Sequence, residues 1–124
     1  METIKILETD DTPGIVLDAE NDVFEITGRS LPEDVTSFYE PALNWLDEYS
    51  ENPKPKTVFI FKLTYFNTAS SKVLLDILMK LEDINSDGNE ILVKWYYPDD
   101  DEDMQEAGEE YADIVDVEFE QLGY

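Results

Sequence analysis

The stretch "TVFIFKLTYFNTASSKVLLDILMKLEDIN", residues 57–85, decides the fold. Residues 57–66 are apolar at both alternating sets of positions, which is typical of a central strand covered on two faces. Residues 69–85 then show helical spacing, with one apolar face made of Val73, Leu74, Ile77, Leu78, Leu81 and Ile84. A strand that passes directly into an amphipathic helix predicts a β-α unit of an α/β sheet.

The segments on either side extend this pattern. We expect strands at 3–10, 14–20, 22–28, 90–98 and 116–122, a helix within 30–52 and an acidic helix within 99–115. The order β-β-β-α-β-α-β-α-β predicts a mixed sheet with right-handed crossovers and helices packed on the sheet. The length suits one domain, residues 1–124. Pro41 costs about 3 kcal/mol inside a regular helix, so we expect a kink there or a second helix beginning near it.

Composition excludes several functional classes. The chain contains no Cys and no His, so it lacks thiolate and imidazole metal ligands and a conventional Ser-His-Asp or Cys-His system. It has five glycines and no glycine-rich phosphate loop. We therefore expect no catalysis, no cofactor and no metal.

The net charge of −23 also limits the partners. Nucleic acids and anionic membranes would be repelled, whereas a basic protein surface would be attracted. The N-terminal residues do not resemble a signal peptide, and the apolar stretches are too short to span a bilayer. We expect a soluble, cytoplasmic protein that binds neither nucleic acid nor membrane.

Two acidic segments resemble cation sites. "DINSDGNEILVK", residues 83–94, begins like an EF-hand loop, but its twelfth position is Lys94 where a bidentate Glu is needed. We interpret it as a helix-ending turn at Gly88. The run at 99–110 could bind a divalent cation weakly, but a solvated helix start is favoured because negative charge suits a helix N-terminus.

The aromatic segment "VKWYYP" places Trp95 and Tyr97 on one face of a strand and Tyr96 on the other. We expect the aromatic bodies to lie in the core. The alternative is an aromatic patch at the sheet edge that receives a partner.

Polar side chains crowd the strand-to-helix junction at Asn67, Thr68, Ser70 and Ser71. A helical wheel places Leu75 and Met79 on the solvent side, in line with Thr68, Ser71 and Lys72. This alignment predicts a docking strip made of Asn67, Thr68, Ser71, Lys72, Leu75 and Met79. The simpler interpretation is that Asn67 or Thr68 only caps the helix, and both interpretations can hold together.

A phosphate suits this position electrostatically, because unpaired N–H groups lie at a helix N-terminus. It would also add nearly two negative charges in the middle of the docking strip. Folding could survive while docking fails. The residues alone leave Thr68, Ser70 and Ser71 as candidate acceptors.

Three blocks carry a family resemblance: "LPEDVTSFYEPALNWLDEY" (31–49), "LTYFNTASSKVLLDILMKLE" (63–82) and "ILVKWYYPDDDEDMQEAGEEY" (91–111). Together they resemble the SiaC-type bacterial regulatory phosphoproteins over essentially the whole chain. That family is in turn similar to STAS-class anti-sigma-factor antagonists, which carry a phosphorylated Ser or Thr at a strand-to-helix junction.

The resemblance implies a single STAS-like domain and a partner-switching protein without catalysis of its own. A cognate kinase phosphorylates the junction threonine, which corresponds to Thr68, and a PP2C-type phosphatase removes the phosphate. The unphosphorylated form binds and activates a diguanylate cyclase, which raises cyclic di-GMP and promotes aggregation or biofilm formation. Ser70 and Ser71 are the lesser candidates.

Two alternatives stay open. STAS antagonists often show Asp-x-Ser-Gly at the junction, and this chain departs from that pattern at residues 67–70, which argues against anti-sigma-factor antagonism. A constitutive acidic protein, inhibitory or structural, that binds basic protein surfaces without phosphorylation would also fit the net charge.

Overall fold

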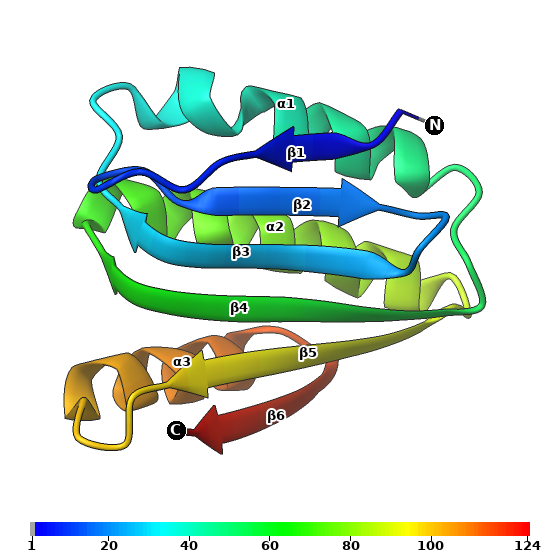
Figure 1. Cartoon of the computed structure of the whole chain (residues 1–124). Coiled ribbons are helices and arrows are strands. Elements are labelled where there is room, and N and C mark those ends of the chain that lie inside the picture. The colour runs from blue at the N-terminus through cyan, green and yellow to red at the C-terminus, as the bar shows by residue number, and fades with distance from the viewer. Residues whose placement is uncertain (1) are drawn as a thin grey trace.

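The computed structural model describes residues 2–124, and the elements follow the predicted order (Figure 1). They are β1 (Ile4–Ile6), β2 (Gly14–Asp18), β3 (Val23–Ser30), α1 (Val35–Tyr49), β4 (Lys56–Phe66), α2 (Thr68–Ser86), β5 (Glu90–Tyr97), α3 (Glu102–Ile114) and β6 (Glu118–Gly123). The predicted alternation of strands and helices is therefore confirmed.

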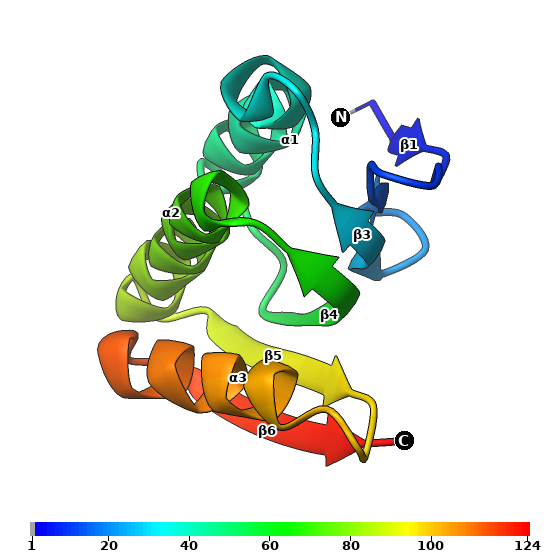
Figure 2. The same cartoon turned by 90° about the vertical axis from the view of Figure 1, so that its left-hand side faces the viewer.

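The strands form one mixed sheet in the order β1-β2-β3-β4-β5-β6. The first three strands pair antiparallel, and β3 to β6 pair parallel. Each parallel crossover advances by one strand in the same direction. Because such crossovers are right-handed, all three helices lie on one face of the sheet, as Figure 2 shows.

The opposite face of the sheet is open, and this corrects the expectation for β4. Phe59, Phe61 and Leu63 point toward the helices and are buried. Ile60 lies on the open face and is half-buried, and Lys62 there is exposed. The prediction of a strand covered on two faces is wrong, because helices reach both faces only where the direction of the strand order reverses.

Helix α1 is one uninterrupted helix with Pro41 inside it, capped by Asp34, whose carboxylate accepts from the Ser37 amide at 3.1 Å. The alternative of a second helix beginning near Pro41 is wrong. Pro41 and Ser37 are both exposed, so water can bond the Ser37 carbonyl group that loses its intrahelical donor.

The core beneath α2 matches its predicted face. Val73, Leu74, Ile77, Leu78, Leu81 and Ile84 are all 8% exposed or less. On β5, Trp95 and Tyr97 face the helices within the core, as expected. Tyr96 faces the open side, where the Lys62 ammonium lies 5.8 Å from its ring centre.

Gly108 explains how α3 approaches the sheet. A Cβ atom at this position would lie 2.5 Å from Cδ1 of Trp95. The Trp95 indole N–H donates to the Met104 carbonyl group at 3.0 Å. The glycine that weakens the helical propensity therefore makes room for the indole ring.

The two acidic segments lie at helix termini, the first at the end of α2 and the second at the start of α3. Helix α2 stops at Ser86, Gly88 has a φ of 101°, and β5 begins at Glu90, which confirms the helix-ending turn. Asp101 caps α3 by accepting from the Met104 amide at 3.0 Å. Between residues 2 and 124, no three acidic side chains converge as a metal site.

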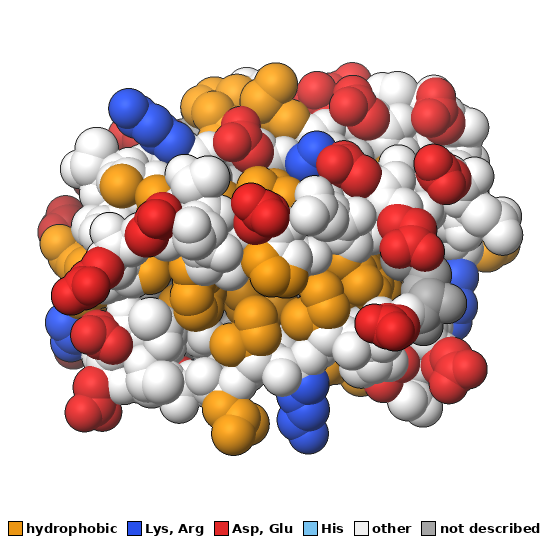
Figure 3. All heavy atoms as spheres, turned by 90° about the horizontal axis from the view of Figure 1, so that it is seen from above, with side chains coloured by type: hydrophobic (Ala, Val, Ile, Leu, Met, Phe, Trp, Pro, Cys, Tyr) orange, Lys and Arg blue, Asp and Glu red, His pale blue; other side chains and the backbone are white. Residues whose placement is uncertain are grey.

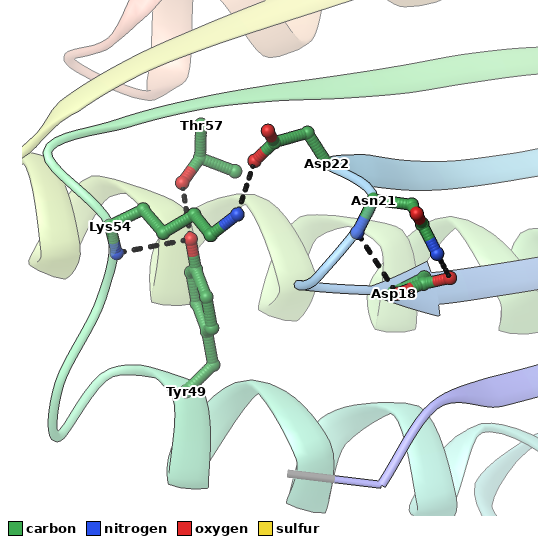
Figure 4. Close-up of polar contacts among 6 residues, drawn as sticks. All are labelled: Asp18, Asn21, Asp22, Tyr49, Lys54 and Thr57. Atoms are coloured by element: carbon green, nitrogen blue, oxygen red, sulfur yellow. Dashed lines mark hydrogen bonds and ion pairs between the residues drawn. The ribbon is translucent and has the colours of Figure 1, made fainter.

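The start of β4 is tied to its neighbours (Figure 4). The Tyr49 hydroxyl group lies 2.7 Å from that of Thr57 and accepts from the Lys54 amide at 3.2 Å. The Lys54 ammonium pairs with Asp22 at 2.8 Å. These contacts fix the end of the sheet opposite to the Asn67 junction.

None of the helices described for residues 2–124 is both long enough and apolar enough to cross a bilayer.

Candidate functional site

The junction between β4 and α2 is built by Asn67. Its backbone is extended, and its side-chain oxygen accepts from the Ser70 amide at 2.8 Å, which makes it the N-cap of α2. Its own N–H donates to the Ser30 carbonyl group at 3.2 Å. The predicted cap is confirmed, and a cap of this kind is worth about 1 kcal/mol.

The three candidate hydroxyls occupy different environments. Ser70 is fully buried, at 0% exposure. Ser71 is half-buried, and its hydroxyl donates to the Thr68 carbonyl group at 2.6 Å. Thr68 is the first residue of α2 and is exposed. In the folded chain, Thr68 is therefore accessible to a modifying enzyme and Ser70 is not.

Ser70 belongs to a buried chain of hydroxyls that joins three elements. Its hydroxyl donates to the Ser30 carbonyl group at 3.0 Å and accepts from the Ser30 hydroxyl at 2.8 Å. The Tyr39 hydroxyl lies 2.6 Å from that of Ser30. Since the Ser30 proton points to Ser70, Tyr39 is the donor. Burial raises the pKa of Tyr39 to about 12, despite the hydrogen bond with Ser30, so Tyr39 keeps the proton that it donates.

A groove between α2 and α3 begins one helical turn after Thr68. We call it the α2–α3 groove, and it is lined by Phe66, Ser71, Lys72, Leu75, Ala107, Glu110, Tyr111 and Ile114. Ile114 is 59% exposed at its rim. The Tyr111 hydroxyl donates to the Ser71 carbonyl group at 2.8 Å and holds α3 against the first turn of α2. Burial, followed by the Glu110 charge, raises the pKa of Tyr111 to about 12.

The predicted docking strip is divided by this geometry. Leu75 is half-buried in the α2–α3 groove and packs against the core. Met79 is 48% exposed and lies in a separate depression between α1 and α2, together with Leu43 and Asp47. Leu75 and Met79 therefore do not form one uniformly exposed strip, because Leu75 borders the α2–α3 groove and Met79 borders the depression beside α1. The helical wheel treats α2 as having one solvent side, but α1 and α3 flank it on either side.

The structure brings Ser71, Lys72 and Leu75 together and adds residues that the sequence had not indicated. Phe66, Ala107, Tyr111 and Ile114 form the other walls of the groove. A signal was present, because Met104, Ala107, Tyr111 and Ile114 recur three or four residues apart within the acidic helix. The high charge of the segment concealed this apolar stripe.

The site suits binding and modification. Its floor is apolar, and Lys72 and Glu110 supply one charge of each sign. Lys72 lies four residues after Thr68, so the two side chains are neighbours on the surface of α2. The site combines the exposed Thr68 hydroxyl group at the N-terminus of α2 with the apolar surface of the groove one turn away.

Comparison with known proteins shows the family and the fold of the chain. The chain matches the model described as "SiaC family regulatory phosphoprotein" over residues 6–124. An uncharacterized protein of Pseudomonas aeruginosa (strain UCBPP-PA14) is 26% identical over 119 residues, which cover 96% of this chain and 94% of the relative.

Solved structures of SiaC from Pseudomonas aeruginosa share the fold. Apo-SiaC is 25% identical with a TM-score of 0.89, and covers 98% of this chain and 99% of its own. SiaC bound to the diguanylate cyclase SiaD, of which it is the activator, is also 25% identical, with a TM-score of 0.92 and the same coverage. The mixed α/β fold is confirmed. From the match over residues 6–124, this chain belongs to the SiaC family of regulatory phosphoproteins.

Proposed function

We propose that this chain is a non-catalytic switch protein whose unphosphorylated form binds and activates a diguanylate cyclase. A cognate kinase phosphorylates Thr68 and blocks this binding, and a PP2C-type phosphatase restores it. The observation that carries the proposal is that Thr68 is exposed at the start of α2, one turn before the α2–α3 groove. Support comes from family membership and from the related SiaC that is the activator of a diguanylate cyclase.

A phosphate on Thr68 is compatible with the folded chain. The N-terminus of a helix tolerates negative charge, and Lys72 lies on the adjacent turn. Asn67 and Ser70 hold the first turn through contacts that do not involve the Thr68 side chain. Phosphorylation therefore changes the surface while the fold is kept.

The phosphate on Thr68 weakens the binding of a partner to the α2–α3 groove. A partner seated in the α2–α3 groove would have to bury or approach nearly two added negative charges on a chain that already carries −23. The apolar contacts of Leu75 and Ile114 stay in place, but the electrostatic cost of the complex rises. This difference between the two states is what makes the modification a switch.

The test is to map the phosphate. The full chain is incubated with ATP and the candidate kinase, and digested with trypsin. Cleavage after Lys62 and Lys72 yields the peptide "LTYFNTASSK", which carries Thr68, Ser70 and Ser71 together. Fragmentation by mass spectrometry should place the phosphate on Thr68.

Two matched variants test which threonine accepts the phosphate. Thr68→Ala should abolish incorporation, whereas Thr36→Ala, at an exposed threonine in the first turn of α1, should leave it unchanged. Phosphate on Ser71 or elsewhere, with Thr68 unmodified, would show that the assignment of the acceptor is wrong.

A further inference from the structure

The free edge of β1 forms a second surface, away from the α2–α3 groove. Among residues 2–124, the sheet order places β1 at an edge, paired only with β2. On the other side of β1, alternate backbone N–H and C=O groups have no strand beside them. Such an edge can accept an extended segment from another chain through main-chain hydrogen bonds.

Apolar side chains line the space between this edge and α1. We call this surface the β1 seam, made of Ile4, Ile6, Phe38, Pro41 and Trp45. Ile4, Pro41 and Trp45 line one shallow groove there, and Ile6 and Phe38 are half-buried against the core. Figure 3, which looks down on α1 and β1, shows hydrophobic side chains gathered in a band on this side of the molecule.

The floor of the β1 seam is fixed. The Trp45 indole N–H donates to the Glu2 carbonyl group at 2.6 Å, which joins α1 to the residues before β1. The strand and the helix are therefore held at a set separation in the folded chain. A segment added beside β1 would therefore bind to a preformed surface.

The rim of the seam is acidic. Glu2 and Glu48 line the groove beside Ile4. Residues 31–52 contain no Lys or Arg, and their acidic side chains are Glu33, Asp34, Glu40, Asp47, Glu48 and Glu51. Figure 3 shows more acidic than basic side chains around the apolar band, with one basic side chain at its lower edge. This charge attracts a basic segment and repels a second copy of a chain with net charge −23.

We propose that the β1 seam binds an extended segment of a basic partner protein, which adds to the sheet beside β1. Successive side chains of a strand point to opposite faces. On the side facing α1, two apolar residues of the partner cover Ile4 and Ile6. A Lys or Arg two positions beyond the apolar pair reaches the acidic rim at Glu2 and Glu48. This surface shares no residue with the α2–α3 groove, so the proposal does not depend on the function assigned to Thr68.

The test uses the full ¹⁵N-labelled chain and the peptide acetyl-Lys-Thr-Val-Thr-Val-Thr-Lys-amide at physiological ionic strength. Amide resonances of residues 2–7 and of α1 should shift, whereas those of α3 should not. The same peptide with its central backbone amides N-methylated keeps its charge but cannot pair as a strand. It should bind at least tenfold more weakly.

A matched pair of chain variants tests how much the acidic rim of the β1 seam contributes to binding of the peptide. Glu48→Lys should weaken the binding of the peptide at least threefold, and Asp113→Lys, which makes the same charge change at an exposed position of α3, should not. Equal binding of the N-methylated peptide would overturn the proposal in favour of unspecific charge attraction. Sedimentation equilibrium that shows the chain dimerising, with the peptide dissociating the dimer, would overturn it in favour of a second copy.

Discussion

Ser30 and Ser70, 40 residues apart in the sequence, exchange two hydrogen bonds in the core. The Ser30 hydroxyl donates to the Ser70 hydroxyl at 2.8 Å, and the Ser70 hydroxyl donates to the Ser30 carbonyl group at 3.0 Å. With Tyr39, they tie the end of β3, the helix α1 and the first turn of α2 together. This linkage holds the turn that carries Thr68 as a helix.

Removing the Ser70 hydroxyl should destabilise the whole chain. Ser70→Ala leaves the buried Ser30 hydroxyl without its acceptor, which costs about 1–3 kcal/mol. Urea unfolding followed by circular dichroism measures this change. Ser71→Ala is the control, since its hydroxyl bonds only within its own turn, and it should cost less than about 1 kcal/mol. Equal losses for the two variants would contradict the structural role of Ser70.

Substitutions that add a negative charge can show whether the cyclase binds at the α2–α3 groove or at the depression around Met79. Ile114→Glu places a carboxylate at the rim of the groove and should weaken binding of the diguanylate cyclase by about 1 kcal/mol or more. Met79→Glu adds the same charge between α1 and α2 and should have a smaller effect. Calorimetry with the purified cyclase compares the two. A larger loss from Met79→Glu would move the docking surface to the other side of α2.

Gly108→Ala should destabilise the chain, although alanine favours helices. In an open helix this change stabilises by about 0.5–1 kcal/mol. Here the added methyl group would lie 2.5 Å from the Trp95 indole ring, and overpacking of this kind costs about 1–3 kcal/mol. The sign of the change in unfolding free energy is the readout. A stabilised variant would show that α3 can move away from β5 without cost.

Stability should fall at alkaline pH. Burial raises the pKa of Tyr39 to about 12 from its ordinary value of 10.0, so the folded chain retains a proton that the unfolded chain loses. The contribution is complete below about pH 10 and is lost as the pH rises toward about 12. Urea unfolding across this range should show the decline.

A phenylalanine variant tests the assignment of this alkaline decline. Tyr39→Phe should be less stable at neutral pH, because Ser30 loses a donor, but its stability should fall less steeply between pH 10 and 12. The control Tyr65→Phe, at an exposed tyrosine, should keep the original slope. An unchanged slope for Tyr39→Phe would mean that other groups cause the decline.

Local sequence patterns predicted the element order and the inner face of α2, because both depend on which residues alternate, repeat or form turns within one segment. The fully buried set from Val73 to Ile84 is an example. The exposure of one face of β4 could not be predicted in this way. It follows from the direction in which successive crossovers advance, which is a property of the whole sheet.

At the candidate site, too, local features could be predicted from the sequence and long-range contacts could not. Asn67 could be named as a cap because capping is local. The burial of Ser70 depends on Ser30, and the partition of Leu75 from Met79 depends on two other helices. These contacts join distant parts of the chain, so inspection of the junction alone left three hydroxyls open.

The central claim is that phosphate on Thr68 separates this chain from its cyclase without unfolding it. The direct measurement is the affinity of the purified diguanylate cyclase for the kinase-phosphorylated chain and for the unmodified chain, with circular dichroism of both. Thr36→Glu, with added charge in the first turn of α1, is the control. We predict binding at least tenfold weaker after phosphorylation, about 1.4 kcal/mol, with unchanged folding and little effect of the control. Equal affinity of the two forms would contradict the account.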